Sequence, residues 1–88
     1  MKFNENKQCY YCGTTYNLHL HHIFEGNANR KVSDRNGFVV YLCMEHHRWV
    51  HLNPTKAIKL KQDCERWYLE QGHTIEDFIK LVGRNYLI

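Results

Sequence analysis

The segment that decides the fold is FVVYLCMEHHRWVH, residues 38–51. Residues 38–42 are an unbroken run of β-branched, aromatic and aliphatic side chains, which is typical of a buried strand. The run leads directly into Cys43 and a histidine-rich segment in which His47 and His51 are four residues apart. That spacing places both imidazoles on one face of a helix. The segment therefore predicts a strand followed at once by a helix that carries metal-binding side chains.

A second strand is predicted upstream of this segment. Residues 18–24 (LHLHHIF) alternate in character and include β-branched and aromatic side chains, so they favour a strand. Residues 25–36 are polar and end in Asn36-Gly37, which is a turn signal. We therefore expect two neighbouring strands that are connected by a polar loop.

Two helices are predicted after the histidine-rich segment. Asn53-Pro54 is typical of a helix start with Asn as the cap, and an amphipathic pattern continues to Gly72. Thr74, with Asp77 three residues later, predicts the cap of a last short helix that Gly83 ends. The positions of these helices that we expect to face the core are Ala57, Leu60, Cys64, Trp67, Tyr68, Ile75, Phe78, Ile79 and Val82.

The chain combines four Cys with seven His in only 88 residues. Cys9-x2-Cys12 and Cys43-x2-His46 have the spacing of the two halves of a tetrahedral zinc site. A structural zinc would also supply stability that the small core of so short a chain lacks. In the competing interpretation the cysteines are small buried hydrophobes, which suits Cys64 but explains the two pairs poorly. The sequence therefore predicts structural zinc at these four ligands.

A DNA-reading zinc finger is the nearest alternative, because His47-x3-His51 has the histidine spacing of that module. The segment between Cys12 and His47 is far longer than the roughly 12 residues that the module allows. The histidines outside the zinc site therefore need another explanation.

Two of these histidines are neighbours in the first strand. Adjacent strand residues point to opposite faces, so His21 and His22 cannot share one task. One metal ligand and one general base is the most economical assignment. We interpret His19 and His73 as packed or solvent-facing side chains.

The ordered patterns C-x2-C, L-H-H-I and L-C-x2-H-H-x3-H, from Cys9 to His51, resemble the HNH nuclease superfamily. The resemblance implies an α+β fold: a small ββα-metal domain with structural zinc over residues 9–52, followed by two C-terminal helices over residues 54–83. We expect residues 1–88 to form one such domain. The segments HHIF and VYLCMEHH also resemble small HNH-type proteins encoded by bacteriophages and prophages.

The resemblance also implies roles for the remaining histidines. In the family the first residue of the strand pair binds the catalytic divalent ion and the second activates water, which assigns these roles to His21 and His22. A His-x3-His pair completes the metal shell in the colicin-type toxin nucleases, and His47 and His51 fit that pattern.

The sequence departs from the family pattern at the residue that orients the base. The family has Asn at the position of Phe38, and the nearest candidates are Asn36 and, behind it, Asp34. Either side chain is a candidate for the orienting role, with Asn36 as the first choice.

The implied activity is hydrolysis of DNA phosphodiester bonds with a single divalent ion, Mg²⁺, Mn²⁺, Ni²⁺ or Zn²⁺. We expect phosphate contacts from Arg30, Lys31, Arg35 and Arg48. The formal net charge of +3 permits such a partner without proving it. One alternative is a non-catalytic zinc module of phage type that binds DNA or a protein. Another is a subunit that cuts only in complex with packaging or recombination proteins.

No apolar run in the sequence approaches the roughly 18 to 20 residues that cross a bilayer, and the N-terminal segment MKFNENKQ is polar. We therefore expect a soluble protein of the bacterial cytoplasm, and the resemblance adds a phage or prophage origin.

Overall fold

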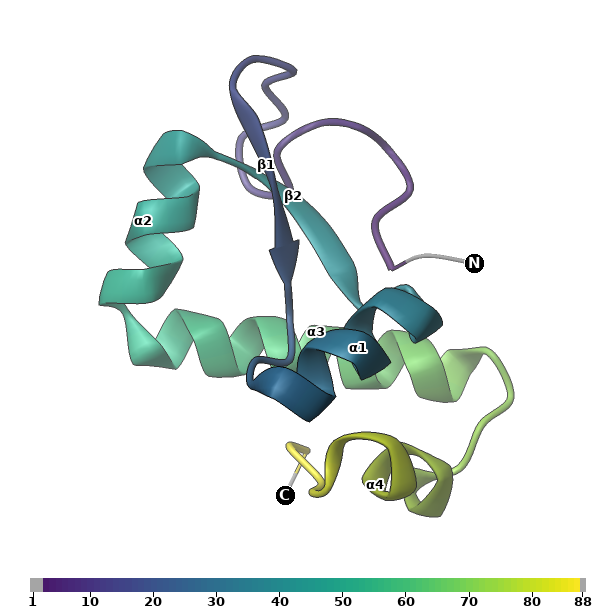
Figure 1. Ribbon diagram of the computed structural model, residues 1–88. Helices are drawn as coiled ribbons and strands as arrows, with labels where there is room; N and C mark the ends of the chain where they lie inside the picture. The colour runs from purple at the N-terminus through teal and green to yellow at the C-terminus, as the bar shows by residue number, and fades with distance from the viewer. Residues whose placement is uncertain (1–2, 88) are drawn as a thin grey trace.

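The computed structural model describes residues 3–87. Within them the chain forms a small α+β fold of two antiparallel strands and four helices (Figure 1). The elements in chain order are β1 (Leu18–His22), α1 (Asn27–Asn36), β2 (Val39–Cys43), α2 (Met44–Leu52), α3 (Pro54–Glu70) and α4 (Ile75–Val82). Among these described helices none has the length and apolar character needed to cross a membrane.

The two strands form an antiparallel pair in which Leu18 lies opposite Cys43 and His22 lies opposite Val39. β2 is buried along most of its length, as its apolar sequence predicts. β1 ends at His22, two residues before the predicted end, and Ile23 donates its backbone N–H to the carbonyl of Phe38. The pairing fixes the histidines of β1 beside the strand that leads into α2.

The prediction of a loop over residues 25–36 is wrong, because most of that segment forms α1. The inner side of α1 is held by Ser33, whose buried hydroxyl donates to the carbonyl of Phe24 at 3.1 Å and accepts from its backbone N–H at 3.2 Å. Gly37 ends the helix in a left-handed conformation with φ of 72° and donates its N–H to the Ser33 carbonyl. α1 is therefore attached to the core through the hydrogen bonds of Ser33. It lacks the stripe of apolar side chains from which a helix can be predicted.

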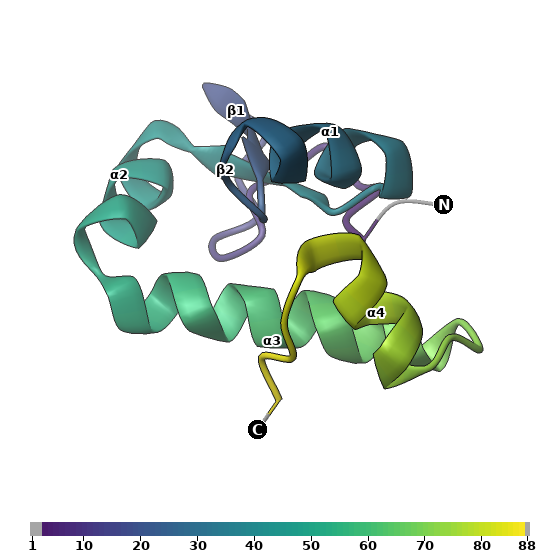
Figure 2. The same ribbon diagram turned by 60° about the horizontal axis from the view of Figure 1, so that its bottom comes forward.

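The core lies between the two strands and α3, which runs beneath the strands in both Figure 1 and Figure 2. α4 packs against α1 and α3. The predicted core positions that are buried are Leu60, Cys64, Tyr68, Phe78 and Val82, while Ala57 and Trp67 pack against them. The prediction is wrong for Ile75 and Ile79, which are 40% and 39% exposed.

The helix ends agree only in part with the predicted caps. Thr74 and Asp77 form the expected reciprocal capping box of α4. Asn53 does not cap α3 with its side chain; instead its Nδ2 donates to the carbonyl of Trp49 at 2.7 Å and closes the end of α2. Cys43, the last residue of β2, is the N-cap of α2, and its Sγ accepts the backbone N–H of His46 at 3.5 Å. The first turn of α2 is therefore built on a predicted metal ligand.

Candidate functional site

The two cysteine pairs of the sequence meet in one cluster. The ligand atoms of Cys9, Cys12, Cys43 and His46 all lie within 4.8 Å of one another. Cys43 Sγ lies 3.2 Å from His46 Nδ1 and 4.0 Å from Cys12 Sγ, and Cys9 Sγ lies 3.5 Å from His46 Nδ1. Ligands about 2.0 to 2.3 Å from a tetrahedral zinc are separated by similar distances. The four residues can therefore hold an ion such as zinc.

A tight turn and the start of α2 bring these ligands together. Cys9 donates its N–H to the carbonyl of Thr14 at 2.8 Å, and Gly13 donates to the carbonyl of Cys9 at 2.9 Å. Gly13 has a φ of 76°, a conformation that favours glycine. Tyr10 donates its N–H to the carbonyl of Tyr41 at 2.9 Å, which ties the turn to β2.

The environment of Cys9 favours the thiolate that a metal needs. Burial acts to raise the pKa of this thiol, but backbone N–H groups of Cys43, Cys12 and Tyr11 stabilise the anion, and the net pKa falls to about 6. Cys64 is the contrasting thiol, because burial in the core raises its pKa. Cys64 is therefore an inert core residue, as the sequence predicted.

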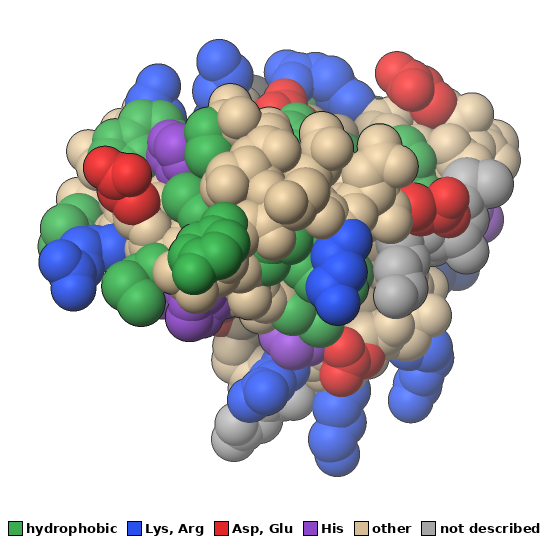
Figure 3. Space-filling view, turned by 90° about the horizontal axis from the view of Figure 1, so that it is seen from above, with side chains coloured by type: hydrophobic (Ala, Val, Ile, Leu, Met, Phe, Trp, Pro, Cys, Tyr) green, Lys and Arg blue, Asp and Glu red, His purple; other side chains and the backbone are tan. Residues whose placement is uncertain are grey.

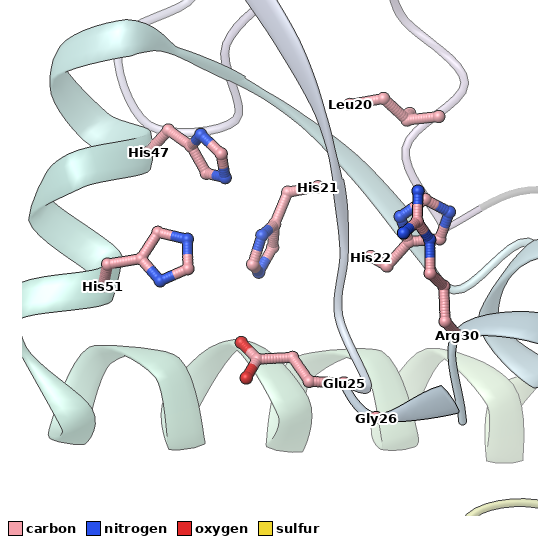
Figure 4. A pocket seen from close by; sticks show the side chains of 8 residues that line it. All are labelled: Leu20, His21, His22, Glu25, Gly26, Arg30, His47 and His51. Carbon is pink, nitrogen blue, oxygen red and sulfur yellow. The ribbon is translucent and has the colours of Figure 1, made fainter. Parts of the chain in front are cut away.

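The structure also brings together His21 of β1 and His47 and His51 of α2. Their ligand nitrogens lie within 4.8 Å of one another, and the three rings point toward a common space in Figure 4. Zinc-bound nitrogens lie about 2.0 to 2.1 Å from the ion, so small side-chain rotations bring all three to one ion. We call this set the histidine cluster.

Two rings of the histidine cluster have lowered pKa values. Burial, followed by the nearby charges of His47 and His51, lowers the pKa of His21 to about 4. Burial and the neighbouring His51 and His19 also lower the pKa of His47. A neutral imidazole is the form that binds a metal, so this donor set fits a divalent transition-metal ion.

The lowered pKa of His21 predicts an acid-sensitive stability. Between pH 6.5 and about 4 the unfolded chain binds a proton at this ring and the folded chain does not, so stability falls as the pH drops through that window. A fully buried ring would contribute about 3 kcal/mol, and solvent in the pocket reduces that figure. The free energy of unfolding is measured by urea titration at several pH values with one equivalent of zinc. It should change less with pH in His21→Gln than in the unchanged protein. Equal slopes would contradict this explanation.

His22 lies on the other side of β1 from His21 (Figure 4), as strand alternation predicts. Its Nε2 is 2.7 Å from Asp34 Oδ1. A carboxylate only accepts hydrogen bonds, so Nε2 carries the proton and Nδ1 of the neutral ring keeps a free lone pair. Asn36 instead donates from Nδ2 to the carbonyl of Val32, so Asp34, not Asn36, is the residue that contacts the proposed base.

The histidine cluster and His22 both line one open pocket of about 380 Å³. Its wall includes His21, His22, His47, His51, Leu20, Glu25, Gly26 and Arg30. The Glu25 carboxylate is directed toward the histidine cluster in Figure 4, although it lies outside the set of close ligand atoms. The pocket wall therefore includes imidazoles that could hold a metal ion and the Glu25 carboxylate on one side of β1, and His22 and the Arg30 side chain on the other side (Figure 4).

The four predicted phosphate-binding residues do not converge. Arg30 lines the histidine pocket, whereas Arg48 lines a separate pocket beside Cys12 and Arg35 lies at the opposite end of α1. Lys31 is exposed on α1. Figure 3 shows Lys and Arg side chains spread over the face rather than gathered in one patch. Arg30 is thus the predicted cation that shares a pocket with the histidines.

Two further residues, His19 and Asp34, lie near the predicted site. His19 is exposed, which agrees with its interpretation as packed or solvent-facing, and its ring centroid lies 5.4 Å from that of His47. Strand alternation, which places His19 and His21 on one face of β1, was the sequence signal for this proximity. Asp34 was one of two open candidates, because the sequence did not reveal the helix that carries it. His73 stacks on Tyr68, away from the cluster.

No protein-family model, curated protein or solved structure matches the chain.

Proposed function

We propose that the protein is a metal-dependent endonuclease of the HNH type that hydrolyses DNA phosphodiester bonds. The observation that carries the proposal is that one open pocket is lined by three imidazoles that could hold a metal ion and by a separate histidine that is paired with a carboxylate. Phosphodiester hydrolysis needs charge stabilisation at phosphorus and a base for water, and these two groups match those two needs.

The histidine cluster is the proposed site of the catalytic ion. His21, His47 and His51 would hold it, and when bound it supplies Lewis-acid stabilisation of the charge that builds on the phosphate. The backbone that carries these histidines favours metal binding, because strand pairing fixes the position of His21 and one turn of α2 fixes the spacing of His47 and His51. A preorganised donor set loses little free energy on binding.

His22 is the proposed general base. Its Nδ1 takes a proton from the attacking water, the new P–O bond forms as the ester P–O bond breaks, and the leaving oxygen is protonated by water. Asp34 holds the ring in the tautomer that leaves Nδ1 free and stabilises the imidazolium that results. Asp34 is therefore a positioning residue.

Substrate binding is proposed to rest on the phosphate backbone. Arg30 is exposed at the wall of the histidine pocket, where it can pair with a phosphate next to the one that is cleaved. Contacts of this kind position a nucleic acid without reading its sequence, so little sequence specificity is expected.

A plasmid-nicking assay tests the proposed activity. Protein with one zinc in the cysteine cluster is incubated with supercoiled DNA and Mg²⁺, Mn²⁺, Ni²⁺ or Zn²⁺, and nicked product should form with at least one of these ions. A protein of full zinc occupancy that cuts neither single-stranded, double-stranded nor branched DNA with any of them would favour the non-catalytic zinc module.

The two proposed metal sites should respond to mutation independently. His47→Ala or His51→Ala is expected to abolish cleavage and leave one zinc per chain in the cysteine cluster, because the two clusters share α2 but no ligand. His73→Ala is the matched control, since this exposed histidine stacks on Tyr68 and does not line the pocket. Metal content and nicking are measured on the same samples. Loss of the cysteine-bound zinc in the His47 variant would refute the allocation of His46 and His47 to different ions.

A further inference from the structure

A fourth histidine lies beside the histidine cluster and has no role in the proposed function. His19 precedes His21 by two residues on β1, so both side chains project from the same strand face. The ring centroids of His19 and His47 are 5.4 Å apart, with 32° between the ring planes. The ring pairs within the cluster are separated by 4.9 to 6.0 Å. His19 is thus as near to His47 as the cluster members are to one another.

His19 differs from the cluster in its freedom to move. His21 is only 7% exposed, whereas His19 is exposed to solvent. The nitrogens of His19 lie outside the set that is mutually within 4.8 Å. Rotation of an exposed side chain about its two χ angles is fast and sacrifices little packing. His19 can therefore approach an ion in the cluster and also withdraw from it.

We propose that His19 is a displaceable fourth ligand of a transition-metal ion held by His21, His47 and His51. The inference rests on the metal site of the proposed function. It adds the class of ion and the identity of the fourth ligand before substrate binds. Imidazole nitrogens favour zinc, nickel, cobalt or copper, whereas Mg²⁺ prefers oxygen ligands. A four-nitrogen shell closes the site, and an oxygen of the substrate phosphate replaces His19 to reach the ion.

Zinc affinity provides the first test. One equivalent of zinc fills the cysteine cluster, and the affinity for a second equivalent is measured by competition with a chelator. His19→Ala and His19→Gln should each bind the second zinc at least about 10-fold more weakly than the unchanged protein, because loss of a residue that only contacts a ligand already weakens metal binding about 10- to 100-fold. His47→Ala should lose the second site, and His73→Ala should retain the original affinity. Unchanged affinity in both His19 variants would overturn the inference.

Cobalt spectroscopy tests whether the ligand is displaceable. The visible bands of four-coordinate Co²⁺ change position when one nitrogen ligand is replaced by oxygen, so Co²⁺ in the second site should give a different spectrum in the unchanged protein, with four imidazoles, than in His19→Ala, with three imidazoles and water. Added dimethyl phosphate should shift the first spectrum toward that of the variant with phosphate bound. Identical spectra before phosphate is added would count against a fourth ligand.

The two proposals fail in different ways. Second-site zinc binding that depends on His19, in a protein that cuts no DNA, supports the fourth ligand and defeats the nuclease. A protein that cuts DNA but whose His19 variants bind zinc normally overturns only the fourth ligand.

Discussion

Replacing Cys43 by serine is expected to remove the zinc and most of the folded structure. Cys43 Sγ contacts two other ligands of the cluster and also accepts the N–H of His46 at the start of α2. Structural zinc in small domains contributes about 10 to 16 kcal/mol, which is comparable to or larger than the roughly 5 to 15 kcal/mol of a whole domain. Zinc content per chain and thermal melting by circular dichroism measure the two losses.

Cys64→Ser is the matched control for this prediction. Cys64 is fully buried in the core and is not part of the cluster, so the same change there should leave one zinc bound. The hydroxyl in an apolar site should lower stability by only about 1 to 3 kcal/mol. If Cys43→Ser and Cys64→Ser had equal zinc content and equal melting temperatures, the cysteine cluster would not be a structural metal site.

The convergence of the cysteine ligands was predictable because each half of the cluster is local in sequence. Two residues separate the ligands in each pair, and a turn or a helix start suffices to orient both. The longer separation is closed by strand pairing, which the apolar run of β2 already predicted. His47 and His51 were predictable for the same reason, since one helical turn relates them.

The partner of His22 could not be identified from the sequence because its helix has no apolar signature. α1 is anchored by the buried hydroxyl of Ser33, a residue that is usually exposed. Without that helix, Asp34 and Asn36 are equivalent loop residues. In the helix Asp34 reaches His22, whereas Asn36 bonds the carbonyl one turn earlier. Asp34 and Asn36 are only two residues apart, yet Asp34 contacts the proposed base and Asn36 makes a hydrogen bond within the helix.

Replacing His22 by alanine is expected to lower the rate of DNA cleavage by about 10²- to 10⁴-fold, the usual contribution of a positioned base. The ring lies outside both groups of close ligand atoms, so both metal sites should keep their affinity. Single-turnover cleavage at saturating metal measures the rate, and a metal count on the same sample shows that the sites are filled. A comparable fall in metal occupancy would instead make His22 a ligand.

Asp34 makes the same prediction sharper, because it is proposed to act only through His22. Asp34→Ala should slow cleavage less than His22→Ala does, and Asp34→Asn should lie between Asp34→Ala and the unchanged protein, because the amide oxygen still accepts the Nε2 proton. Asn36→Ala should lower the cleavage rate less than Asp34→Ala does, since the Asn36 amide bonds to the α1 backbone.

In the double variant of His22 and Asp34 the cleavage rate should fall no further than in His22→Ala alone, because a positioning residue has no effect without the group it positions. A double variant that loses the product of the two single effects would show that Asp34 acts independently of His22.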